Sequence, residues 1–122
     1  MARILVADDD ELYREMIESM LTRDGHLVIG VKSGKGCLEQ LDGAQFDLLI
    51  TDLFMPHFDG LDLIAAVRSR HGTMPIIGIT GGLSGLVKPY VEAMLAMGTH
   101  AVLAKPFTVE RFADEVRKAL HN

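Results

Sequence analysis

Apolar residues along this chain alternate between two kinds of segment. Short runs of β-branched and other aliphatic residues predict strands that are buried on both faces, because such strands are almost continuously apolar. There are five of these runs: Ile4–Ala7, His26–Val31, Phe46–Thr51, Pro75–Thr80 and Ala101–Ala104. Each run is followed by a segment in which apolar residues recur at helical spacing. The pattern therefore predicts five strands alternating with five helices.

The predicted helices each carry an apolar stripe at the spacing of one helix face. The stripes are Leu12, Met16, Ile17, Met20 and Leu21; Leu38 and Leu41; Leu61, Ile64 and Val67; Val91, Met94 and Leu95; and Val109, Phe112, Val116 and Leu120. Three residues are predicted N-caps: Asp10, Asp59 and Thr108. Gly72 and Gly98 stand where helices should end. Strand–helix alternation implies parallel strands joined by right-handed crossovers, so we expect an α/β doubly wound sheet with helices on both faces.

Length, composition and charge narrow the classes of function. The chain has 122 residues, of which 48% are apolar, and this fits one domain over residues 1–122. The net charge is −5, with 12 basic and 17 acidic side chains, which disfavours direct binding to nucleic acid. A single cysteine, Cys37, excludes an internal disulfide. With neither a signal peptide nor an apolar run long enough to span a membrane, the sequence predicts a cytoplasmic protein.

Candidate chemistry gathers where the predicted strands end. The first strand ends at Asp8-Asp9-Asp10, the third at Asp52, the fourth at Thr80, and the fifth just before Lys105. The carboxyl ends of parallel strands meet at one edge of the sheet, where ligands bind in open α/β folds. We therefore expect several carboxylates, a hydroxyl and an ammonium group to converge there.

That set of groups suits phosphoryl transfer onto a carboxylate. Clustered carboxylates repel one another and favour a cation, and Mg²⁺ prefers hard oxygen ligands. Asp9 and Asp52 could bind the ion directly, with Asp8 acting through water. A carboxylate facing an incoming phosphoryl group can act as a nucleophile and form an acyl phosphate. Lys105 would add positive charge and Thr80 a hydrogen bond, which suits a reaction that depends on positioning and charge stabilisation.

The sequence resembles the response-regulator receiver family over essentially its whole length. The matching segments are Ile4 to Asp10, Asp52 to Gly60, Ile79-Thr80-Gly81 and Lys105-Pro106-Phe107. The resemblance implies a flavodoxin-like receiver fold with strand order 2-1-3-4-5. It also implies a cis bond between Lys105 and Pro106.

The resemblance further assigns roles to the residues at the strand ends. Asp52 is the implied phosphoacceptor, Thr80 the switch hydroxyl, and Lys105 the partner of the phosphate. Asp8, Asp9, Asp52 and the backbone carbonyl of Phe54 are the implied ligands of Mg²⁺, or of Mn²⁺. Such a domain is a switch rather than an enzyme. It receives its phosphoryl group from a histidine kinase or a phosphotransfer protein. It then signals through its fourth helix, fifth strand and fifth helix to a downstream protein, as a monomer or as a phosphorylation-dependent dimer.

Three features depart from the family pattern. Val102 occupies the position of an aromatic residue that usually accompanies the switch hydroxyl. The segment from Thr80 to Lys105 is longer than usual, and we place the extra length in Gly81–Gly85. We expect this loop and the helix that follows it to be mobile without phosphate and to order with it. Phe54 and Gly82 occupy two positions that tune phosphate lifetime in the family. Of these two residues only Phe54 could shield the acyl phosphate from water, which predicts a moderately long lifetime.

Two other functions remain open at the level of sequence. One is a small aspartyl phosphatase with Asp8 as nucleophile, although Leu12 stands where that class has a hydroxyl residue. The other is a binding module with a receiver fold that works without phosphate. Both a stand-alone regulator and a domain of a longer protein fit the sequence.

Overall fold

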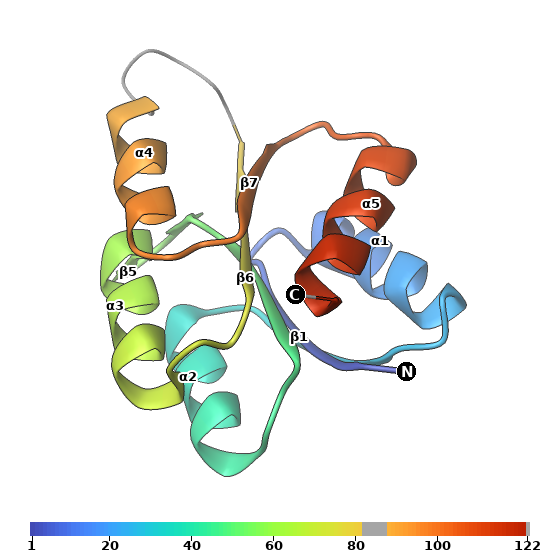
Figure 1. Ribbon diagram of the computed structural model, residues 1–122, viewed down its shortest axis with the longest axis horizontal. Coiled ribbons are helices and arrows are strands. Elements are labelled where there is room, and N and C mark those ends of the chain that lie inside the picture. Colours follow the sequence, from blue (N-terminus) through green and yellow to red (C-terminus); the bar gives the residue numbers. More distant parts are fainter. Residues whose placement is uncertain (82–87, 122) are drawn as a thin grey trace.

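The protein is described by a computed structural model covering residues 1–81 and 88–121. Five parallel strands form one twisted sheet in the order β2-β1-β3-β6-β7 (Figure 1). The strands are β1 (Arg3–Ala7), β2 (Leu27–Val31), β3 (Leu48–Asp52), β6 (Ile76–Thr80) and β7 (Ala101–Ala104). Every strand begins and ends within two residues of its predicted bounds. The predicted α/β receiver fold and strand order are therefore confirmed.

Within the described residues, five helices cover the two faces of the sheet. They are α1 (Glu11–Arg23), α2 (Gly34–Gly43), α3 (Gly60–His71), α4 (Lys88–Ala96) and α5 (Val109–Leu120). Helices α1 and α5 lie on one side of the sheet, and α2, α3 and α4 on the other (Figure 1). This arrangement explains why β1, β3 and β6 are buried along their whole length apart from Arg3, whereas the edge strands β2 and β7 are partly exposed.

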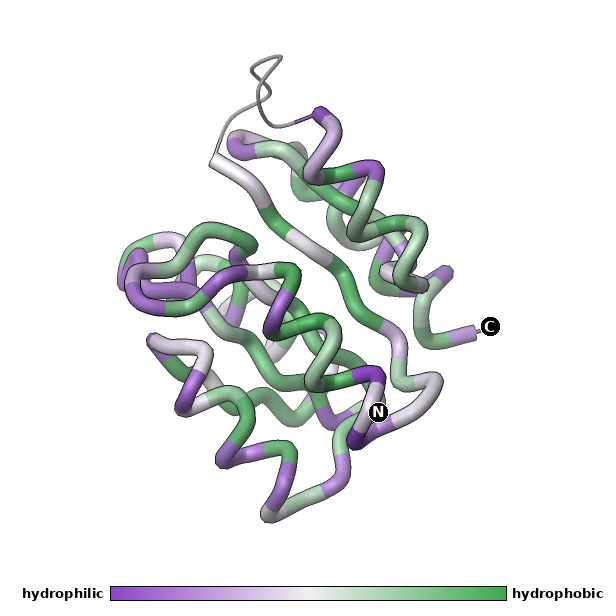
Figure 2. Tube along the Cα trace, turned by 90° about the vertical axis from the view of Figure 1, so that its left-hand side faces the viewer, coloured by the Kyte–Doolittle hydropathy of each residue, from purple (hydrophilic) through white to green (hydrophobic). Residues whose placement is uncertain are grey.

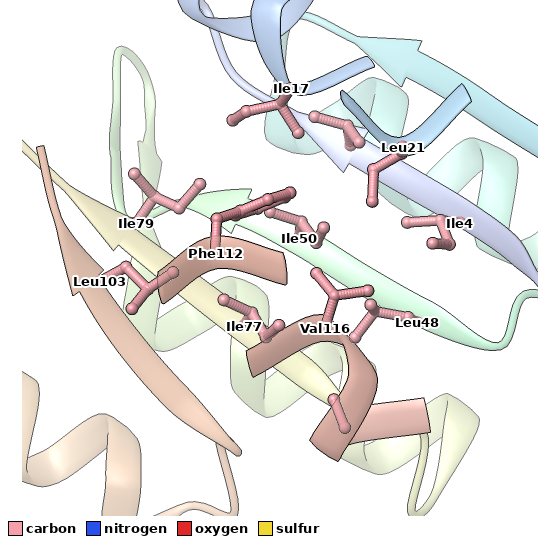
Figure 3. Packing of buried hydrophobic residues seen from close by; sticks show 12 residues of the cluster. Ile4, Ile17, Leu21, Leu48, Ile50, Ile77, Ile79, Leu103, Phe112 and Val116 are labelled. Atoms are coloured by element: carbon pink, nitrogen blue, oxygen red, sulfur yellow. The ribbon is translucent and has the colours of Figure 1, made fainter. Parts of the chain in front are cut away.

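Two apolar clusters fill the space between the sheet and its helices. On the α1/α5 side, Phe112 and Val116 of α5 and Ile17 and Leu21 of α1 pack against aliphatic residues of the central strands (Figure 3). On the other side, the core includes Cys37, whose thiol is buried and has its pKa raised to about 12 by that burial. The central strands contribute residues to both clusters, and the green colour inside the molecule in Figure 2 marks such hydrophobic residues.

The predicted stripe on α1 is only partly correct. Ile17 and Leu21 are buried, but Leu12 is 80% exposed and Met16 is 40% exposed. At about 100° per residue, Leu12 lies roughly 180° around the helix from Leu21, so the two cannot face the same side. Ile17 and Leu21 contact the sheet, and Leu12 therefore points to solvent.

The predicted helix boundaries are confirmed. The side chains of Asp10, Asp59 and Thr108 accept hydrogen bonds from the first turns of α1, α3 and α5. Gly72 and Gly98 end helices with positive φ angles of 59° and 91°, which glycine adopts without steric cost. Within residues 1–81 and 88–121, no helix is long and apolar enough to cross a membrane.

A two-stranded antiparallel sheet follows β3 and was not predicted from the sequence. It consists of β4 (Phe54–Met55) and β5 (Phe58–Asp59). Pro56 and His57 make the turn, and His57 has a positive φ of 63°. Gly60 follows at the start of α3, where a Cβ atom would lie 2.4 Å from the Leu53 carbonyl oxygen. Only glycine therefore allows the start of α3 to approach the residue that follows Asp52 this closely.

Candidate functional site

Three carboxylates meet at the carboxyl edge of the sheet. Asp52 is the last residue of β3, and Asp8 follows β1, whose Ala7 pairs with Thr51 of β3. One carboxylate oxygen from each of Asp8, Asp9 and Asp52 lies within 4.8 Å of the others. Asp8 and Asp52 are buried, whereas Asp9 is exposed. The convergence predicted from the strand ends is therefore present for all three acidic residues.

Lys105 brings a positive charge into this acidic group. Its Nζ atom lies 3.1 Å from Asp8 Oδ2 and 3.6 Å from Asp52 Oδ2. The backbone N–H of Lys105 donates to the Thr80 carbonyl at 2.8 Å, which ties the β7 end to the β6 end. The bond between Lys105 and Pro106 is cis, as the resemblance implied.

Thr80 lies at the same edge of the sheet, at the end of the strand that pairs with β3. It is the last residue of β6 and is fully buried. Its neighbour Ile79 pairs with Asp52 across the β3–β6 ladder. The Thr80 side chain thus stands one residue beyond the level of Asp52.

The electrostatics of the site reflect opposing effects. Burial raises the pKa of the Asp8 carboxyl, and the charge of Asp52 raises it further. The hydrogen bonds from the Asp10 N–H and from Lys105 lower it, but the net shift is upward. For Lys105, burial lowers the pKa of the ammonium group, and the contacts with Asp8 and Asp52 raise it more than burial lowers it. The site therefore carries more negative charge than Lys105 neutralises, which favours binding of a cation.

Backbone and side-chain contacts from outside the sequence motifs support the acidic group. Arg14 Nη1 of α1 donates to the Asp8 carbonyl at 2.8 Å. The Tyr13 ring lies 4.4 Å from Lys105 Nζ, a cation–π contact. Helical spacing places Tyr13 and Arg14 on the first turn of α1, but the sequence alone does not show that this turn faces the strand ends. These two residues were missed for that reason.

Comparison with known proteins agrees with this geometry. The family model for the response regulator receiver domain matches residues 4–117. The chain belongs to this family. It is accordingly a receiver domain of the two-component response regulators, which are signalling regulators.

Relatives of this receiver domain include short and long proteins. The response regulator receiver protein CpdR of Brucella abortus is 32% identical over 120 residues, with 98% of each chain covered. The response regulator protein FleR of Pseudomonas aeruginosa is 33% identical over 117 residues, which cover 96% of this chain and 24% of FleR. This receiver domain thus spans nearly all of one relative and about a quarter of the other.

Solved structures show the same fold. The chemotaxis response regulator CheY4 of Vibrio cholerae has a TM-score of 0.86 at 30% identity, covering 98% of this chain and 99% of CheY4. The response regulator TrrA of Thermotoga maritima, solved in complex with Mg²⁺ and BeF, has a TM-score of 0.85 at 25% identity, covering 98% and 100% of the two chains.

The features that depart from the family pattern lie around this site. Val102 is half-buried on β7, opposite Gly78 of β6, and packs against the cluster on the α2/α3/α4 side. Phe54 is exposed, and its backbone N–H donates to Asp52 Oδ1 at 3.0 Å. Gly82 and most of the Gly81–Gly85 segment, which we expected to order on phosphorylation, lie outside the described residues.

Proposed function

We propose that this receiver domain, taken as one domain over residues 1–122, is a switch that accepts a phosphoryl group on Asp52. The observation that carries the proposal is the meeting of Asp8, Asp9 and Asp52 within 4.8 Å, with Lys105 in ion pairs to Asp8 and Asp52. A carboxylate oxygen of Asp52 attacks phosphorus, the bond from phosphorus to the donor's leaving group breaks, and an acyl phosphate forms. Lys105 offers an ammonium group to the transferred phosphoryl oxygens, and Thr80 a hydroxyl.

The donor set of the site fits a hard divalent cation. Within the described ranges, Asp8, Asp9 and Asp52 are the only group of three or more acidic, histidine or cysteine side chains close enough to share an ion. These carboxylates, with the backbone carbonyl of Phe54, would hold Mg²⁺ or Mn²⁺. The bound ion supplies positive charge that offsets the charge on the phosphoryl oxygens. The fit rests on oxygen ligands, on the buried position of two of them and on an excess of negative charge.

The partners follow from this reaction. A histidine kinase or a histidine phosphotransfer protein would supply the phosphoryl group. The downstream target would be a protein that contacts α4, β7 and α5. The exposed side of helix α5 carries both acidic and basic side chains, and Asp114 forms ion pairs with Arg117 and Lys118. This surface of mixed charge does not suit binding to nucleic acid. The domain would act as a monomer or as a phosphorylation-dependent dimer.

The test is to incubate the protein with acetyl phosphate and Mg²⁺ and to measure its intact mass. We expect the wild type to gain the mass of one phosphoryl group and Asp52→Asn to gain none. Asp10→Asn is the matched control, because asparagine caps a helix as well as aspartate does. This variant should gain the mass of one phosphoryl group, as the wild type does.

Two outcomes would contradict the proposal. No mass gain in the wild type would favour a binding module that works without phosphate. A gain that persists in Asp52→Asn would place the phosphate elsewhere, as in the phosphatase alternative with Asp8 as nucleophile.

A further inference from the structure

Tyr90, in the first turn of α4, contacts both members of the cross-strand pair that follows the acceptor strand. Phe54 of β4 and Asp59 of β5 lie directly opposite each other. The Tyr90 ring packs on the Phe54 ring with centroids 5.3 Å apart and planes tilted by 31°. The Tyr90 hydroxyl donates a hydrogen bond to Asp59 Oδ1. One side chain of α4 is thus attached to the small sheet at two points.

The hydroxyl contact fixes the direction of the Tyr90 ring. Asp59 is the N-cap of α3 and also accepts from the Leu61 N–H at 2.7 Å, so its carboxylate is held in place. The hydrogen bond from Tyr90 is the largest cause of a lowered pKa at Asp59. Burial and the same bond raise the pKa of Tyr90. Both directions fit a neutral phenol donating to an ionised carboxylate.

Phe54 lies two residues after the proposed phosphoacceptor, and its ring rests on Tyr90. The Phe54 side chain is 47% exposed, so the sheet does not hold the ring by burial. Its backbone N–H donates to the Asp52 carboxylate, two residues before it. Phe54, Tyr90 and the metal-ligand candidate Asp9 line the same open depression. Without Tyr90, a half-exposed phenylalanine at this position would be free to turn to solvent.

The opposite end of α4 is held by a separate contact. Arg68 of α3 donates to the carbonyls of Met97 and Gly98, just after α4 ends. Helices α3 and α4 lie next to each other on one side of the sheet, with β5 beside them (Figure 1). Within the described residues, Tyr90 joins the first turn of α4 to the small sheet that follows Asp52.

We propose that Tyr90 is a positioning residue for the phosphorylated state: it holds the Phe54 ring beside the acyl phosphate and so limits its hydrolysis. The inference rests on the proposed function of Asp52. In hydrolysis, a water oxygen attacks phosphorus, the bond between phosphorus and the Asp52 oxygen breaks, and inorganic phosphate leaves. Tyr90 does not contact the reacting atoms. It acts through Phe54, which restricts the approach of water.

The experiment measures how fast phosphorylated protein decays after excess acetyl phosphate is removed, by intact mass. Tyr90→Ala should shorten the half-life at least about fivefold, a barrier change of about 1 kcal/mol. Tyr90→Phe keeps the ring contact and loses only the hydrogen bond that fixes the direction of the ring, so its half-life should lie between those of Tyr90→Ala and the wild type. Leu95→Ala is the matched control, because Leu95 is 44% exposed on the same helix. It should decay like the wild type.

A second arm separates positioning from a general effect on the fold. Phe54→Ala should shorten the half-life, and adding Tyr90→Ala to it should change nothing more, because the two side chains act as one unit. Equal half-lives for Tyr90→Ala and the wild type would overturn the inference, as would independent, additive effects of the two alanine variants. Absence of any phosphorylated wild-type protein would instead overturn the proposed function of Asp52.

Discussion

At the scale of single residues, Asp8 is the most deeply buried carboxylate of the site. It is 1% exposed, and it faces both the charge of Asp52 and the ammonium group of Lys105. Burial outweighs its hydrogen bonds, so the pKa of Asp8 lies above its ordinary value. A carboxyl in this position weakens the folded state when it is ionised, unless a cation compensates for the charge.

This shift predicts a pH-dependent effect of Asp8→Asn in the absence of divalent cations. Because the pKa of Asp8 is raised in the folded state, that state binds more protons than the unfolded state between about pH 3.9 and the folded-state pKa. The stability contributed by protonated Asp8 is present below that pH and is lost as the pH rises through the folded-state pKa. At pH 7 we expect Asp8→Asn to have a higher free energy of unfolding than the wild type, measured by urea denaturation with EDTA present.

The difference in free energy of unfolding between Asp8→Asn and the wild type should shrink as the pH is lowered toward 4. Asp10→Asn is the control. Its free energy of unfolding should stay within about 0.5 kcal/mol of the wild-type value, because residue 10 is exposed and asparagine can still cap α1. An Asp8→Asn variant less stable than the wild type at pH 7 under these conditions would show that the ion pair with Lys105 outweighs the cost of burial.

At the scale of elements, Arg68 of α3 joins the turn that follows its own helix to the residues that follow α4. Its guanidinium donates to the carbonyls of Gly72 and Met74 before β6, and to those of Met97 and Gly98 after α4. Burial lowers the pKa of Arg68, yet the group keeps four carbonyl partners. The planar fork of arginine suits this set of acceptors, whereas an ammonium group does not.

We therefore predict that Arg68→Lys lowers the free energy of unfolding by about 2 kcal/mol, the range for hydrogen bonds to a charged group. Arg70→Lys is the matched control on the same helix. Arg70 makes an exposed ion pair with Asp42 at 3.0 Å, and such pairs contribute at most about 1 kcal/mol. Urea denaturation of both variants tests the comparison, and equal losses would contradict the role given to Arg68.

At the scale of the whole molecule, stability comes from two clusters that share the central strands. Helix α1 contributes Ile17 and Leu21 to the cluster it shares with α5, while Leu12 on the same helix is exposed. The hydrophobic contribution of a leucine therefore depends on which side of the helix it occupies, and sequence spacing alone misplaced Leu12.

A pair of identical substitutions on α1 measures that difference. Leu21→Ala should lower the free energy of unfolding by about 2 to 5 kcal/mol, because it removes buried methyl groups and leaves a cavity. Leu12→Ala should change it by no more than about 0.5 kcal/mol. Thermal or urea denaturation gives both values. A loss at Leu12 as large as that at Leu21 would mean that α1 presents another face to the sheet.

The fold class, the strand order and the acidic group at the strand ends follow from the sequence and its family resemblance. Short, continuous apolar runs such as Ile4–Ala7 and Pro75–Thr80 are typical of strands that helices cover on both faces of a sheet. Because such strands are parallel, their carboxyl ends meet at one edge of the sheet. Helix caps such as Asp59 and Thr108 act through neighbours only a few residues away, so they too were predictable.

Only the tertiary structure decided which contacts cross between elements. The exposure of Leu12 depends on how α1 rotates against the sheet. The ring of Tyr13 meets Lys105 only because the first turn of α1 packs against the residues that follow β7. Tyr90 is 36 residues from Phe54 in the chain, and nothing local to either residue indicates that their rings touch. The local sequence pattern predicts which residues are buried and where strands and helices begin and end. Contacts such as that between Tyr90 and Phe54 depend instead on packing between elements that are far apart in sequence. For that reason the strand-end residues Asp8, Asp9, Asp52 and Lys105 could be predicted from the sequence, whereas the packing of Tyr13 and Tyr90 beside them could not.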